Sequence, residues 1–292
     1  MMEKKLIVNA DGFGFTPGVN RGIIESIKKG IVRSTSALAN MPAIEEITNF
    51  QKQFPEVSIG IHFNLSVGRP VSPPNEVKSL VNAKGEFLGE KFVPYLLTGK
   101  IRFAEMVKEL ENQVKRLVED FGITLTHFDG HQNKHLYPQF FFAALKVAKR
   151  WNISFMRSHN RYLFFKDNTG RFRKLFLYYL SHPQRLLTHS AAKLLTKYAH
   201  MRGIKTPDRL ITPGYVDSSK KSFLETWLMI IEKLPEGVNE IYCHPGYPDD
   251  LLAKYATYVE ERKIEVEILT SRELKKAIRD KGVQLISFKD LI

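Results

Sequence analysis

Cysteine is almost absent from this chain of 292 residues, in which Cys243 stands alone. One cysteine excludes an internal disulfide and any metal site built from several thiolates. Apolar runs long enough to cross a membrane are also missing, and the apolar stretch near the N-terminus is too short for a secretory signal peptide. The sequence has no internal repeats or low-complexity segments. These absences lead us to expect a cytoplasmic protein.

Acidic residues are missing from one long segment, residues 171–207, although they are mixed with lysine and arginine elsewhere. Apolar residues recur at helical spacing in it, which predicts a basic amphipathic insertion. Three roles stay open for this segment: contact with anionic lipid at the inner membrane surface, a lid over an active site, or a solvated face packed on the rest of the protein. Its eight positive residues are Arg171, Arg173, Lys174, Arg185, Lys193, Lys197, Arg202 and Lys205.

Composition places the chain among ordinary globular proteins. Hydrophobic residues make up 43% of it, enough to bury one large core, so we expect a single domain over residues 1–292. The formal net charge is +13, and most of it falls in residues 171–207. No aromatic-basic recognition motif accompanies that charge, so we expect no nucleic-acid partner.

Apolar segments of strand and helix character alternate along the chain, which indicates an α/β fold. The predicted strands cover residues 6–8, 34–41, 57–65, 122–126, 153–157, 239–247, 264–268 and 283–288. The predicted helices cover residues 19–27, 44–53, 103–121, 140–151, 223–234 and 272–281.

One stretch, residues 126–138, concentrates groups that can carry chemistry. It holds His127, Asp129, His131 and His135 between a strand signal and Pro138, where the next helix can begin. Divalent metals bind imidazole and carboxylate, and the ends of parallel strands bring side chains together on one side of a sheet. The other interpretation is a set of surface or hydrogen-bonded histidines.

Further polar residues stand at or near the ends of other predicted strands. Asp11 follows the first strand, His62 lies within the third, and Arg157 and His244 lie at the ends of two later ones. Each has an ordinary alternative: a capping aspartate, hydrogen-bonded histidines, and a surface salt bridge in place of an anion or oxyanion contact for Arg157. Together they suit hydrolysis, because a metal held by such groups polarises a carbonyl and activates water.

Several short motifs, in order along nearly the whole chain, give it a resemblance to a known family. They are residues 6–11 with Phe13-Gly14, Ile59-Gly60-Ile61-His62, residues 126–131, Tyr242-Cys243-His244-Pro245-Gly246 and Leu269-Thr270-Ser271. On these motifs the chain resembles the YdjC-like carbohydrate deacetylases, including the chitooligosaccharide and hopanoid-associated members.

The resemblance implies a distorted (β/α) barrel that uses a divalent metal, magnesium or else zinc, to remove N-acetyl groups from amino sugars. By position it implies that His62 and His131 bind the metal and that Asp11 matches the first of two adjacent family aspartates. It makes His244 a candidate general acid. Arg157 is a further candidate catalytic residue because of its place at a strand end, independently of the resemblance. The substrate would be an acetylated amino sugar or glycolipid. Monomer and homodimer both stay open.

Two positions depart from the family pattern. Gly12 replaces the second aspartate, and Asn133 stands where a third histidine often follows His131-Gln132. Since glycine has no ligand atom, three outcomes stay open: Asp11 takes the missing place, Asp129 or a water completes the shell, or metal binding is weaker. The alternative function is therefore a catalytically impaired glycan- or glycolipid-binding protein of the same fold.

Overall fold

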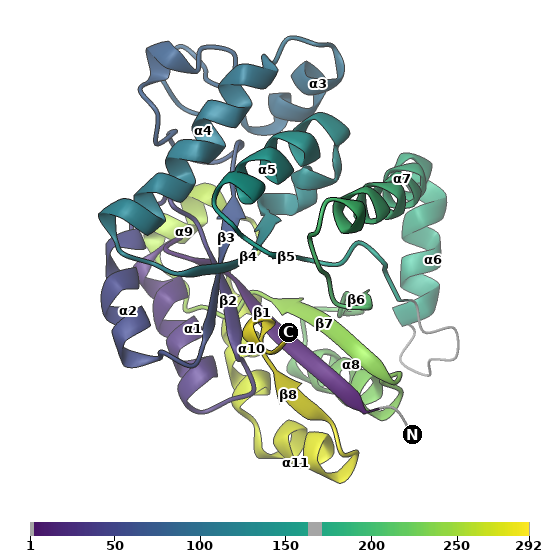
Figure 1. Cartoon of the computed structure of the whole chain (residues 1–292). Helices are drawn as coiled ribbons and strands as arrows, with labels where there is room; N and C mark the ends of the chain where they lie inside the picture. The colour runs from purple at the N-terminus through teal and green to yellow at the C-terminus, as the bar shows by residue number, and fades with distance from the viewer. Residues whose placement is uncertain (1–2, 163–170, 292) are drawn as a thin grey trace.

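The computed structural model describes residues 3–162 and 171–291, except for the side chains of residue 171 and residues 184–189. Within them one sheet of eight strands, all paired in parallel, organises the molecule (Figure 1). The strands are β1 (Lys4–Phe13), β2 (Ser34–Ala37), β3 (Ser58–Phe63), β4 (Leu125–Gly130), β5 (Phe155–Met156), β6 (Arg209–Ile211), β7 (Gly237–Cys243) and β8 (Gln284–Ile286).

The strand order is β5-β4-β3-β2-β1-β7-β6, and β8 pairs with β1 outside this series. Strand β1 has two different partners along one side: its first half pairs with β8, and its second half, from Asn9 onward, pairs with β2. Two isolated parallel bridges, Phe155 to Lys205 and Arg161 to Leu210, connect the β5 edge with the β6 edge. The sheet is therefore curled toward closure, and the predicted distorted barrel is confirmed.

Helices surround this sheet, and the pair α6–α7 stands at one side of it (Figure 1). Every helix in the described ranges falls short of the length and apolar content that a bilayer crossing requires. The helices are α1 (Pro17–Lys28), α2 (Ile47–Gln53), α3 (Phe92–Leu97), α4 (Phe103–Lys115), α5 (Pro138–Arg150), α6 (Arg171–Ser181), α7 (Pro183–Met201), α8 (Lys220–Glu232), α9 (Asp250–Tyr255), α10 (Glu261–Thr270) and α11 (Arg272–Asp280).

Short turns complete the chain. A π-helical turn, Arg116–Asp120, extends α4, and 3₁₀ turns cover Ile44–Glu46, Pro74–Glu76, Gly89–Lys91, His131–Leu136 (η5) and Phe288–Asp290.

Local sequence explains where the first helix begins. The Thr16 hydroxyl accepts a hydrogen bond from the Val19 amide at 3.3 Å, and Pro17 occupies the first turn, where its missing N–H costs nothing. The helix buries Val19 and Ile23 beneath the sheet, whose strand β1 is buried from Leu6 to Phe13. This packing fixes the end of β1, where Asp11 lies.

Three of the differences between the predicted segments and the structure bear on the site. Residues 264–268, predicted as a strand, belong to helix α10, because the buried positions Arg262, Glu265, Val266 and Leu269 recur at three and four residues. Strand β1 continues past the predicted stop to Phe13. Strand β4 starts at Leu125 rather than Gly122, so Asp129 lies within a strand.

Candidate active site

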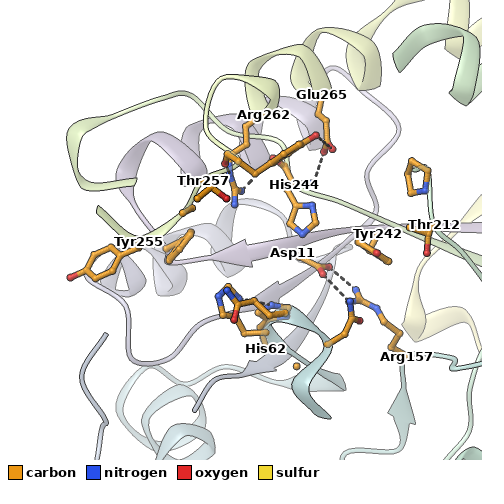
Figure 2. A pocket seen from close by; sticks show the side chains of 18 of the residues that line it. Asp11, His62, Arg157, Thr212, Tyr242, His244, Tyr255, Thr257, Arg262 and Glu265 are labelled. Atoms are coloured by element: carbon orange, nitrogen blue, oxygen red, sulfur yellow. Dashed lines mark hydrogen bonds and ion pairs between the residues drawn. The ribbon is translucent and has the colours of Figure 1, made fainter. Parts of the chain in front are cut away.

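A cavity of about 370 Å³ opens at the carboxyl ends of the strands (Figure 2). Five of the predicted site residues line it, contributed by segments far apart in the chain: Asp11 from β1, His62 from β3, His131 after β4, Arg157 after β5 and His244 after β7. The carboxyl ends of parallel strands are where α/β folds gather ligands and catalytic groups. The strand-end pattern in the sequence thus located residues that meet in space.

Asp11 is 4% exposed and held in a fixed orientation. Its Oδ1 accepts hydrogen bonds from Arg157 Nη2 at 2.6 Å and Asn9 Nδ2 at 2.8 Å, and its Oδ2 accepts one from Arg157 Nη1 at 2.8 Å. The two parallel bonds from one guanidinium make this a bidentate pair, the geometry that fixes a carboxylate most strongly. Figure 2 shows the Asp11 carboxylate directed toward the Arg157 guanidinium, with His62 and His244 nearby.

Arg157 connects three buried carboxylates. Besides Asp11 it donates from Nη2 to Asp129 Oδ2 at 2.7 Å and from Nε to Glu240 Oε1 at 2.7 Å. Burial disfavours the charged form of Asp129, but Arg157 and then His62 outweigh it and hold the pKa of that carboxyl below its usual range. Burial raises the pKa of Glu240 to about 7 despite Arg157. Because of these bonds to Asp11, Asp129 and Glu240, most of the Arg157 N–H groups are not available to bind substrate.

The Asp129 carboxylate orients the His62 ring. Its Nδ1–H donates to Asp129 Oδ1 at 2.7 Å, while Ser36 Oγ donates to Asp129 Oδ2 at 3.0 Å. A carboxylate that binds one ring nitrogen fixes the tautomer and leaves a lone pair on the other. That other nitrogen, Nε2, faces Nδ1 of His131 at 3.4 Å.

The histidine pair fits a divalent metal. Two nitrogens each about 2.1 Å from one tetrahedral ion lie roughly 3.4 Å apart, which matches the separation of His62 Nε2 and His131 Nδ1. Burial, followed by the nearby His62, keeps the pKa of His131 well below its ordinary value, so the ring is neutral, as a ligand must be. Asp11, His62 and Asp129 also each offer a ligand atom within 4.8 Å of the others.

The segment after His131 has an unusual backbone. Gln132 and Asn133 both have φ of +56°, the left-handed region that non-glycine residues rarely adopt, and they are consecutive. Both line the cavity, so Asn133, one of the two family departures, faces the site without supplying an imidazole. Strained backbone of this kind persists where the surrounding structure enforces it.

The other departure, Gly12, lies next to Asp11 with φ of +99°. A Cβ built there would meet Leu38 Cδ1 at 3.8 Å and Phe15 Cβ at 4.0 Å, which are ordinary contacts. Space is therefore available for a side chain at this position, but the backbone conformation disfavours one.

Helix α10 holds the segment that carries His244, a feature that the sequence prediction missed. The Glu265 carboxylate accepts from the His244 backbone N–H and from the Tyr258 hydroxyl, the latter at 2.8 Å. Arg262 Nη1 donates to the His244 carbonyl at 3.4 Å, and both side chains line the cavity (Figure 2). Residues 262 and 265 at helical spacing were the available signal, hidden by the assignment of this segment to a strand.

The buried groups of this wall have shifted acidities. Burial lowers the pKa of His244 to about 3, so its ring is neutral near pH 7. Burial raises the pKa of Glu265 to about 7, against the hydrogen bonds from His244 and Tyr258 that favour the charged form.

Two histidines of the stretch 126–138 do not line the cavity. The His127 ring stacks on Phe288, with centroids 3.8 Å apart, and the His135 ring lies 5.1 Å from that of His159. Both are fully buried, and burial lowers the pKa of His127 to about 3 and that of His135 to about 4. For these two the interpretation as structural histidines is the better one.

Comparisons with known proteins bear on the family and the fold of this chain. The sequence model of the family described as YdjC-like protein matches residues 5–280. A protein named carbohydrate deacetylase from Thermoanaerobacter pseudethanolicus is 32% identical over 292 residues, 99% of each chain, and one from Geobacillus stearothermophilus is 32% identical over 99% of this chain and 98% of its own. A crystal structure from Enterococcus faecalis V583 has a TM-score of 0.77, 29% identity and 99% coverage of both chains. The chain belongs to the YdjC-like family.

Proposed function

We propose that this protein hydrolyses the N-acetyl group of an amino-sugar substrate with the help of a divalent metal. The observation that carries the proposal is the convergence of Asp11, the His62–His131 pair and His244 on one cavity. Relatives that match over nearly their whole length are named carbohydrate deacetylases, which supports it. We place the enzyme in the cytoplasm as part of the same proposal.

The proposed metal ligands are Nε2 of His62 and Nδ1 of His131. A bound divalent ion would polarise the acetyl carbonyl and acidify a water. Asp129 is assigned to orienting His62 rather than to the metal, because its oxygens already accept from His62, Ser36 and Arg157. Magnesium follows from the family resemblance, whereas two imidazole ligands favour zinc.

Asp11 is the proposed proton acceptor for the attacking water, because its carboxylate is fixed by Arg157 and lies on the cavity wall. His244 is neutral near pH 7, so it donates to the leaving amine only after it has gained a proton. Arg157 is proposed as a positioning residue that orients Asp11 and Asp129, in place of the oxyanion contact expected from the sequence.

Acetate release and metal content, measured on the same preparations, test the proposal. N-acetylated chitooligosaccharides are the probe substrates, with magnesium and zinc supplied in turn. We expect the wild-type protein to release acetate, and His62→Ala and His131→Ala to lose metal and activity together. The exposed His200, hydrogen-bonded to Thr206, supplies the control His200→Ala, which should retain both. Stoichiometric metal in the His62→Ala, His131→Ala double variant would falsify the assignment of the ligands.

A glycan- or glycolipid-binding protein without catalysis is the second candidate, and Gly12 is the observation that favours it. The two candidates differ in one result: the binding protein would retain chitooligosaccharides in a direct binding assay yet release no acetate with either metal.

The proposal extends to three further features: a lipid-linked substrate, peripheral membrane contact through residues 171–207, and a homodimer. The charge of this segment supports the membrane contact. A single domain over residues 1–292 fits the one sheet that spans the described chain.

A further inference from the structure

Helix α6 presents an apolar face to solvent. Phe176, Leu177 and Leu180 are 55%, 51% and 68% exposed. Together with exposed Arg173 they follow the spacing i, i+3, i+4, i+7, which places all four on one side of a helix. Single exposed leucines are ordinary on protein surfaces. Three large apolar side chains on the same side of successive helical turns form an apolar patch.

A different side of α6 faces the protein. Phe172, Leu175 and Tyr179 are half-buried and recur at three and four residues. Among the residues that the structure describes, the helix therefore has a supported inner face and an outer face that packs on no other element.

The charge of this segment selects the partner of its outer face. Arg173 is exposed on the face itself, and α7 carries the exposed Lys193 and Lys197. No acidic residue lies anywhere in residues 171–207. A second copy of this chain would bring the same positive charge against itself, whereas an anionic lipid surface complements both the apolar residues and the cations.

We propose that the outer face of α6 docks on an anionic lipid surface, with Phe176, Leu177 and Leu180 at the interface. This inference depends on the proposed function only for the substrate that the surface would carry, a lipid-linked amino sugar. Docking itself depends on the helix alone.

One side chain connects the docking helix to the candidate active site. Lys174 Nζ donates to the backbone carbonyls of Tyr215 at 2.5 Å and Val216 at 2.8 Å. Tyr215 lines the cavity, stacks on Phe223 with centroids 3.5 Å apart, and accepts from Trp227 Nε1 at 3.0 Å through its hydroxyl. Docking of α6 would thus hold the Tyr215 wall of the cavity close to the lipid surface.

Sedimentation with vesicles tests the docking. We expect the full-length protein to pellet with phosphatidylglycerol vesicles at low salt, less so at high salt, and little with phosphatidylcholine vesicles. The triple variant Phe176→Gln, Leu177→Gln, Leu180→Gln should lose at least about tenfold in partitioning. Its matched control is Leu97→Gln, an equally exposed leucine on α3 (64%), which should partition as the wild type does.

Several results would overturn the inference. Equal, negligible pelleting with both vesicles would do so, as would a triple variant that still binds. Loss of self-association in the triple variant without any vesicle binding by the wild type would assign the face to a second copy. Acetate release from soluble chitooligosaccharides is measured in parallel and should survive in the triple variant. Failure of the proposed function would therefore be seen separately from failure of the docking.

Fluorescence tests the connection to the cavity. The chain has two tryptophans, so Trp151→Phe leaves Trp227, the hydrogen-bond donor to Tyr215, as the sole reporter. Phosphatidylglycerol vesicles should shift its emission, and Lys174→Met should remove the shift while pelleting persists. An unchanged shift in Lys174→Met would refute the role given to Lys174.

Discussion

Arg157 shows how one side chain can organise a site. Its planar guanidinium binds Asp11 through two parallel hydrogen bonds while also reaching Asp129 and Glu240. A buried charge network of this kind is stable only when each member is paired, because an unpaired buried charge is costly.

The first prediction at the residue scale is that Arg157→Lys lowers both stability and activity. Lysine keeps the charge but cannot form the bidentate pair, so Asp11 loses its fixed orientation and a carboxylate is left without its partner. We expect the free energy of unfolding to fall by about 3 kcal/mol, as when a buried pair is broken. Urea unfolding measures the stability, and acetate release measures a fall in kcat larger than the change in KM. A variant of wild-type stability and kcat would refute the positioning role.

The second residue-scale prediction concerns Gly12→Asp. The added carboxylate supplies a hard oxygen next to Asp11 and should tighten metal binding in calorimetry. Because Gly12 has φ of +99°, the side chain also imposes strain on the order of 1–2 kcal/mol on folding.

Gly12→Ala is the matched control, since it carries the same backbone strain without a ligand atom. Both variants should unfold at lower urea concentration than the wild type, and Gly12→Asp alone should gain affinity. Equal affinities in the two would mean that the metal shell is already complete without this residue.

The sequence alone identifies candidate site residues where these lie at the ends of predicted strands. Asp11, His62, His131 and His244 were singled out by this logic, and the structure brings all of them to one cavity. The surroundings of Arg157 were not predictable, because its partner Glu240 lies inside strand β7 and no local pattern connects the two. Contacts between residues 83 positions apart depend on the closing of the sheet.

At the scale of elements, α10 is the clearest case in which pattern reading failed. Ile264, Val266 and Ile268 alternate with glutamates, which is the signature of a half-buried strand. The helix instead buries Arg262 and Glu265, polar residues that a hydrophobicity pattern counts as exposed. They are buried because they bind the backbone of the His244 segment, so a functional contact overrode the local pattern.

The element-scale prediction separates the structural and chemical roles of Glu265. Glu265→Gln keeps an oxygen that can accept from the His244 amide, whereas Glu265→Ala leaves that buried amide without a partner. We expect the alanine variant to lose about 1–3 kcal/mol of stability and most activity, and glutamine to restore most of both.

The pH profile of kcat gives a readout that packing alone would not move. If Glu265 only positions His244, the glutamine variant should keep the wild-type profile. A profile that loses an ionisation near the raised pKa of Glu265, about 7, would show instead that this carboxyl takes part in proton transfer.

At the scale of the whole molecule, the sequence predicts the α/β fold class but not the contacts that close the sheet into a barrel. Alternating strands and helices predicted a parallel sheet, yet the sheet edges meet through isolated bridges at Lys205 and Arg161, outside any predicted strand. The basic segment 171–207 was recognisable from its composition alone. Periodicity does not predict that this segment divides into two helices. Nor does it predict the hydrogen bonds from Lys174 to the cavity wall, which depend on tertiary contacts.

The last prediction concerns the response of the whole fold to acid. His135 and His159 are buried where η5 meets α7, and His159 Nδ1–H donates to the Ala192 carbonyl at 3.3 Å. Burial lowers the pKa of His135 to about 4 and that of His159 well below its ordinary value. With folded pKa values below the unfolded value of about 6.5, the unfolded chain binds more protons, so stability falls with acid.

The stability that these two histidines permit is fully present above about pH 6.5 and is lost as pH falls through their folded pKa values, at up to about 1.4 kcal/mol per pH unit for each. Glu240 and Glu265, with pKa values raised to about 7, oppose this trend. Their contribution to the free energy of unfolding falls as pH rises from about 4.3 to 7. His159→Asn isolates the histidine contribution, because the asparagine amide can still donate to Ala192 but does not titrate. Urea unfolding at pH 7.5, 6.0 and 5.0 should show a smaller acid-induced loss in His159→Asn than in the wild type, and an identical loss would place the acid sensitivity outside the α7 contact.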